Sequence, residues 1–122
     1  MFATLAFAPL MLAQAATAVM VEQQYETRDV AYEALVEGDA AAALIELEAA
    51  LAENPDDPAI LINLGSAHSA LGNLERAEFY YNAARNSSEE YELELANGRW
   101  MASREAASLA LASVELQALA SR

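Results

Sequence analysis

Residues 58–84, PAILINLGSAHSALGNLERAEFYYNAA, carry the clearest structural signals of this chain. Asp57 can cap a helix, and Pro58 suits the first helical turn, where no backbone N–H is needed. Gly72 can end that helix in the left-handed conformation, which glycine adopts without steric cost, and Asn73 can cap the next helix. The stretch therefore predicts two antiparallel helices, over residues 58–71 and 74–86.

The same signals recur 34 residues earlier in the chain. The aligned pairs are Gly38 with Gly72, Ala43 with Ala77, Leu47 with Tyr81, and Ala50 with Ala84. Asp39 follows Gly38 as Asn73 follows Gly72, so Asp39 is expected to cap a helix in the same way. We therefore expect a preceding helical hairpin, formed by residues 22–37 and 40–53.

The segment 58–84 resembles a tetratricopeptide repeat. That family's pattern places a large residue, then Leu-Gly, then an aromatic residue on the first helix, and Ala followed four residues later by an aromatic residue on the second. These places hold Leu61, Leu64, Gly65, His68, Ala77 and Tyr81. The resemblance implies a mainly α fold, with two tetratricopeptide-like helical hairpins in an α-α superhelix, over residues of about 24–57 and 58–89 within a repeat region 19–90.

The two copies depart from the family pattern at different places. The first copy ends on the family's proline as Pro55, but Thr27 and Ala34 stand where bulky residues are usual. In the second copy, Glu89 stands where the proline is expected.

Small side chains at matching positions give the repeat a physical basis. Gly65 and Ala77 would let two helix backbones approach closely, and Tyr81 could fill the space beside their crossing. The predicted repeat-packing residues are Leu64, Gly65, Ala77, Tyr81 and Ala84.

Residues 1–18 resemble a secretory signal peptide. An apolar run is followed by the small-residue triplets Ala13-Gln14-Ala15 and Ala16-Thr17-Ala18, and Glu22 is the first charged side chain. No Lys or Arg precedes the run, which leaves open a truncated or misassigned start. An uncleaved membrane anchor and an amphipathic first helix of a cytosolic protein are the alternatives. The first interpretation predicts a periplasmic or secreted protein of bacterial type.

Residues 91–122 do not continue the repeat. Tyr91, Leu93 and Leu95 alternate with glutamates, and Asn97-Gly98 is a strong signal for a two-residue hairpin turn. We expect a β-hairpin of residues 91–96 and 99–102, with Leu95 opposite Trp100 on the packed face. An irregular continuous helix is the alternative.

A final helix is predicted from a capping Ser103 to about Ser121. Its apolar residues cover a broad arc, with Leu109, Leu116 and Leu119 on one side and Leu111 and Val114 on another. The helix therefore either caps the repeats or forms a homo-oligomer interface.

Composition and charge exclude several classes of function. The 122 residues include 19 acidic and 6 basic side chains, and the formal net charge of −13 opposes binding to nucleic acid or anionic lipid. The chain has no cysteine and one histidine, so we expect neither catalysis, nor a metal site, nor a cofactor. His68 occupies the repeat's aromatic position, which indicates a packed ring.

The resemblance implies a protein or peptide partner bound in the concave groove of the repeats. The matched groove positions are Tyr25, Arg28, Asp29 and Tyr32 from the first repeat, and Ala59, Ile62, Asn63, Ser66 and Ser69 from the second. Among them, Tyr25, Arg28, Tyr32, Ile62, Asn63 and Ser66 are the predicted binding residues. The resemblance thus implies a non-enzymatic interaction scaffold, and self-association through the last helix is the alternative.

Overall fold

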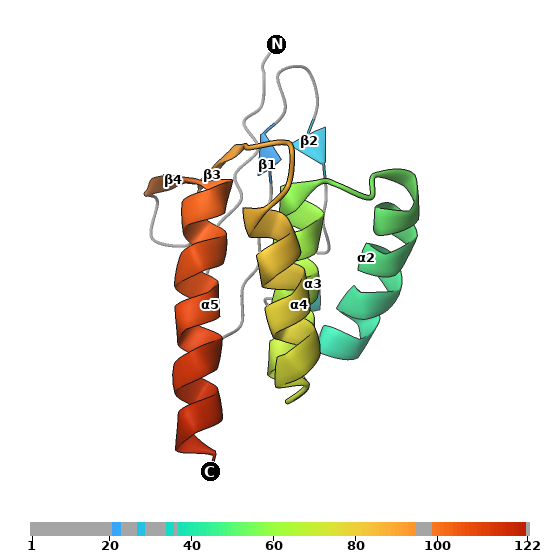
Figure 1. The fold of residues 1–122 in the computed structure, drawn as a ribbon. Coiled ribbons are helices and arrows are strands. Elements are labelled where there is room, and N and C mark those ends of the chain that lie inside the picture. Colours follow the sequence, from blue (N-terminus) through green and yellow to red (C-terminus); the bar gives the residue numbers. More distant parts are fainter. Residues whose placement is uncertain (1–20, 23–26, 29–33, 36, 95–98, 122) are drawn as a thin grey trace.

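The computed structural model describes residues 21–22, 27–28, 34–35, 37–94 and 99–121. Figure 1 shows the helices lying side by side with short strands at one end. The helices are α2 (Ala40–Glu53), α3 (Pro58–Ala70), α4 (Leu74–Arg85) and α5 (Ser103–Ala120). The strands are β1 (Val21–Glu22), β2 (Thr27–Arg28), β3 (Glu92–Glu94) and β4 (Trp100–Ala102).

Helices α2 to α5 pack in the order of the chain, and α3 also touches α5. Helix α3 lies at the centre of the core, because every residue from Pro58 to Ser69 is buried. The fold is mainly helical, with a repeat region, a β-hairpin and a C-terminal helix, as the sequence predicted. The helices predicted over 40–53, 58–71 and 74–86 are confirmed to within one residue at each end.

The predicted helix ends are confirmed in detail. Gly38 and Gly72 both have a φ of +83°, in the left-handed region. Asp39 accepts a hydrogen bond from the backbone N–H of Ala42 at 3.1 Å, and Asn73 accepts one from Arg76 at 3.4 Å. Asp57 caps α3 by accepting from the N–H of Ala59 at 2.9 Å. These caps satisfy N–H groups that have no partner inside the helix.

The predicted hairpin is confirmed, but its register differs by one residue. Glu94 pairs with Trp100, and Leu93 pairs with Met101. The prediction of Leu95 opposite Trp100 is therefore wrong; Leu95 and the predicted turn Asn97-Gly98 lie outside the described residues. A shift of one residue exchanges the two faces of a strand, so Met101 faces the core and Trp100 is 46% exposed.

The register is fixed by bonds between Tyr91 and Ser103, which continue the ladder beyond the strands. The Ser103 N–H donates to the Tyr91 carbonyl at 2.8 Å, and the Tyr91 N–H donates to Ser103 Oγ at 3.0 Å. The predicted helix cap at Ser103 is thus wrong. Ala102 is the N-cap residue and makes no side-chain cap bond, because alanine has no polar side-chain atom. The Ser103 hydroxyl accepts from the Tyr91 N–H instead.

The sheet is larger than the predicted hairpin. Four strands lie in the order β2-β1-β3-β4, and β1 pairs with β3 through Val21 and Leu93. The helix predicted over 22–37 is therefore wrong at β1 and β2, while Ala34 and Leu35 are helical. The physical reason is that β3 offers unpaired backbone groups along one edge, and β1 satisfies them. The other residues of 22–33, and Val36, lie outside the described residues.

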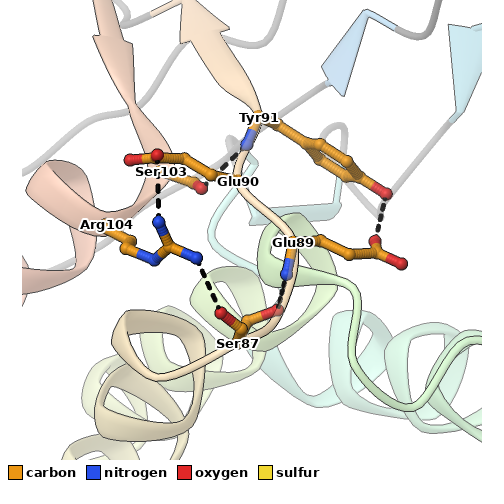
Figure 2. Close-up of polar contacts among 6 residues, drawn as sticks. All are labelled: Ser87, Glu89, Glu90, Tyr91, Ser103 and Arg104. Atoms are coloured by element: carbon orange, nitrogen blue, oxygen red, sulfur yellow. Dashed lines mark hydrogen bonds and ion pairs between the residues drawn. The ribbon is translucent and has the colours of Figure 1, made fainter.

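A polar network holds the hairpin and α5 to the repeat region (Figure 2). Arg104 pairs with Glu90 at 3.1 Å and donates to the Ser87 carbonyl at 3.0 Å. Ser87 Oγ in turn donates to the carbonyl of Asp56, in the turn between α2 and α3. Hydrogen bonds from Ser88 hold the pKa of the Asp56 carboxyl below its usual value. The network therefore ties three segments that are distant in the sequence.

Replacing Ser103 by alanine is expected to lower the free energy of unfolding by about 1–2 kcal/mol, because the Tyr91 N–H would lose its acceptor in a partly buried site. Urea unfolding followed by circular dichroism measures this change. Ser108→Ala, on the exposed side of α5, is the matched control and should change stability by less than about 0.5 kcal/mol. Equal stabilities for the two variants would contradict the assignment.

The predicted signal peptide, residues 1–18, lies outside the described residues. Within the described part of the chain, no helix has the length and apolar character needed to cross a bilayer.

Candidate functional site

The predicted groove residues of α3 do not form an open surface. Ile62, Asn63 and Ser66 are fully buried, and Ala59 and Ser69 are at most 2% exposed. A partner cannot reach these side chains in this structure, so the expectation that they line an accessible groove is wrong. Tyr25 and Tyr32 lie outside the described residues, as does Asp29. Arg28 belongs to strand β2 and not to a helix.

Two of the buried polar side chains on α3 are used for internal packing. The hydroxyls of Ser66 and Tyr81 lie 2.9 Å apart, and Ser66 Oγ also donates to the Ile62 carbonyl at 3.1 Å. Ser69 donates to the side chain of Gln117 at 3.3 Å, which joins α3 to α5. Hydrogen bonds within the protein thus occupy the hydroxyls that the groove prediction assigned to a partner.

The structure brings together the predicted repeat-packing residues on α3 and α4. Leu64, Ala77 and Ala84 are fully buried, and Tyr81 is 1% exposed. The Tyr81 ring covers Gly65 so closely that a β-carbon at Gly65 would lie 2.5 Å from Cε1 of the ring. Glycine is therefore required here by close approach, since its own backbone is helical.

His68 packs in an aromatic stack between α3 and α4. Its ring lies parallel to that of Tyr80, with centroids 5.5 Å apart, and the Arg76 guanidinium lies 5.6 Å from the Tyr80 ring centre. Burial lowers the pKa of His68, and the positive charge of Arg76 lowers it further, while Glu48 opposes the shift. The ring is thus neutral at pH 7 and serves as the packed aromatic that the sequence predicted.

The lowered pKa of His68 predicts that the protein loses stability as pH falls below about 6.5. Below that value the unfolded chain binds a proton that the folded protein does not, so the free energy of unfolding decreases until the folded pKa is reached. We expect a lower urea midpoint at a pH of about 5.5 than at about 7.5. His68→Phe, which keeps an aromatic ring, should reduce this difference; an unchanged difference would contradict the assignment.

Helix α5 leaves part of its apolar surface uncovered. Its buried side, formed by Ala106, Ala107, Ala110, Leu111 and Val114, packs mainly on α4. On the outer side, Leu116 is 67% exposed, Leu119 is 59% exposed and Leu109 is 42% exposed. The two apolar groups predicted from the sequence therefore have different roles. Leu111 and Val114 contribute to the core, and Leu109, Leu116 and Leu119 are exposed.

A shallow groove of about 360 Å³ lies between the start of α4 and the end of α5. Leu74, Val114, Ala118 and Leu119 supply its apolar side chains. The exposed Leu116 lies three residues before Leu119 on α5 and is not among the residues that line the groove. We call the surface lined by Leu74, Glu75, Glu78, Val114, Glu115, Ala118 and Leu119 the α4–α5 groove.

Three carboxylates border the α4–α5 groove: those of Glu75, Glu78 and Glu115. All three residues are exposed, and none makes an ion pair with a described residue. The nearest arginine in the sequence, Arg76, is held over the Tyr80 ring instead. The groove therefore has an apolar lining, with negatively charged side chains at its border.

The described residues show no arrangement suited to metal chemistry. No three His, Cys, Asp or Glu side chains among them converge on a common point. The arrangement that the described surface does offer is apolar contact combined with negative charge, which can bind a polypeptide.

Sequence reasoning missed the α4–α5 groove because its walls come from two helices separated by the hairpin. The exposed leucines of α5 were visible as a broad apolar arc. No sequence signal placed Leu74, Glu75 and Glu78 beside that arc, since this contact depends on how α5 packs against α4.

Comparison with known proteins agrees with the geometry of the repeat region. Residues 34–93 match the family described as tetratricopeptide repeat. Searches of curated proteins and of solved structures gave no significant match. The matched segment contains α2, α3 and α4 together with both left-handed glycines. Residues 34–93 of this chain are therefore a tetratricopeptide repeat region.

Proposed function

We propose that this protein is a non-enzymatic adaptor that binds another protein through the α4–α5 groove. A tetratricopeptide repeat region suggests a role in protein–protein interaction. The observation that supports this particular surface is the exposed apolar side of α5, where Leu116 and Leu119 are 67% and 59% exposed. The concave surface of α3 is a weaker candidate, because Ile62, Asn63 and Ser66 are buried.

Photo-cross-linking in the producing cells tests the proposal. A photoreactive phenylalanine analogue replaces Ala118, inside the groove, or Ile45, which is 73% exposed on α2. We expect a covalent adduct with another protein from position 118 and little from position 45. Adducts of equal yield from both positions, or none from position 118, would refute binding at this surface.

Self-association through α5 is a second candidate, favoured by the same exposed leucines. It predicts a dimer in sedimentation experiments that dissociates on Leu116→Glu. Ile45→Glu is the matched control, because it places the same charge at an exposed apolar position on α2. A monomer at all concentrations tested would exclude this candidate.

We also propose that the protein is exported, which rests on the signal-like residues 1–18. Mass spectrometry of the mature protein tests export: cleavage after Ala15 or Ala18 would support it. An intact N-terminus would favour the membrane-anchored or the cytosolic alternative.

A further inference from the structure

We infer that the α4–α5 groove binds a basic amphipathic helix of the partner protein, with leucine-like side chains along one face and Lys or Arg beside them. This inference rests on the proposed function and adds the chemistry of the partner.

The shape of the groove suits a helix. Two packed helices form its walls, and its apolar residues Leu74, Val114, Ala118 and Leu119 lie between them. An amphipathic helix binds such a groove by inserting side chains spaced three or four residues apart. The lining residues cover one to two turns of α4 and of α5, so one or two inserted side chains would fill the groove.

The charge of the groove selects a basic partner. Glu75, Glu78 and Glu115 border the apolar residues, and none is neutralised by a described residue. A cation placed beside these carboxylates would gain attraction from all three. An approaching acidic helix would be repelled by the same groups, and the net charge of −13 extends that repulsion over the whole molecule.

The three carboxylates also disfavour a second copy of this chain as the occupant of the groove. A symmetric contact through α5 would bring Glu115 of one copy toward Glu115 of the other, along with the glutamates of α4. No arginine is among the residues that line the groove, and Arg76, next to Glu75 in the sequence, packs over Tyr80 instead. The border of the groove therefore opposes self-association and favours a basic helix.

The test uses labelled synthetic peptides of about 14 residues, a length at which a helix can form on binding. One peptide has leucines at helical spacing with lysine on both flanks. Its control has the same leucines with glutamate in place of lysine. Fluorescence anisotropy with the full chain measures both dissociation constants. We expect the lysine peptide to bind at least about ten-fold more tightly, with affinity that decreases as salt increases.

Two sets of variants localise the binding. The combined variant Glu75→Gln, Glu78→Gln and Glu115→Gln should weaken the lysine peptide by about ten-fold or more. The combined variant Glu37→Gln, Glu46→Gln and Glu53→Gln makes the same change in net charge at exposed positions away from the groove, and should weaken it by less than about two-fold. Leu119→Ser should also weaken binding, because it replaces an apolar side chain of the groove lining with a polar one. Circular dichroism verifies that each variant is folded.

Three outcomes would overturn the inference. They are absence of binding by the lysine peptide, equal binding by the glutamate peptide, and equal weakening by the two sets of glutamine variants. Equal weakening by the two sets would mean that the net charge of the protein attracts the peptide and that no specific binding site is involved. If position 118 still cross-links to another protein, the proposed function remains and only the partner's chemistry is wrong. If position 118 forms no adduct, the proposed function fails as well.

Discussion

Replacing Tyr81 by alanine is expected to lower the free energy of unfolding by about 3–5 kcal/mol. The Tyr81 side chain is 1% exposed and is among the largest fully buried side chains in the core. Its removal would leave a cavity between α3 and α4, and the Ser66 hydroxyl would lose a partner at 2.9 Å. Urea unfolding monitored by circular dichroism measures the loss.

Tyr81→Phe separates the ring from the hydroxyl. The Ser66 hydroxyl would keep its bond to the Ile62 carbonyl at 3.1 Å, so we expect a decrease of only about 1 kcal/mol. Similar losses for Tyr81→Ala and Tyr81→Phe would show that the ring does not fill the crossing of the two helices.

Replacing Gly65 by leucine is expected to lower the free energy of unfolding by about 2–3 kcal/mol. Leucine favours a helix over glycine by about 1 kcal/mol, so propensity alone predicts the opposite sign. Steric conflict prevails because the first added atom would already lie 2.5 Å from the Tyr81 ring, and that ring is enclosed on all sides. Ala49→Leu, at an exposed position in α2, is the control and should change stability little.

Combining Gly65→Leu with Tyr81→Ala gives a sharper test of the same contact. The new leucine would occupy space vacated by the tyrosine ring, so the double variant should be more stable than the sum of the two single losses predicts. The coupling energy is expected to be about 1–3 kcal/mol. Additive losses would show that Gly65 and Tyr81 do not contact each other.

The groove residues show how a family resemblance can misplace a site. The resemblance correctly predicts the helices and the crossing of α3 and α4, because those depend on small residues that recur at fixed spacing. It does not predict whether the first helix of a repeat is exposed. In this chain Asn63 and Ser66 are buried, and Ser69 is joined to Gln117 of α5. An accessible apolar groove lies between α4 and α5, and we propose the binding site there.

The helices and their ends were determined by the sequence itself. Left-handed glycines at Gly38 and Gly72 and capping side chains at Asp39, Asp57 and Asn73 act within a few residues of their own position. The backbone conformation there depends on local sterics and local hydrogen bonds, so the sequence pattern is sufficient to predict it.

The register of the hairpin, the four-stranded sheet and the groove were decided by the tertiary structure. Tyr91 is fixed by Ser103, twelve residues away, and this contact moves Met101 into the core and Trp100 to the surface. Val21 completes the sheet by pairing with the distant Leu93. The groove exists because α5 returns along α4 and places Glu115 and Leu119 beside Leu74. Each of these features joins residues far apart in the chain, and no local preference specifies which distant groups will meet.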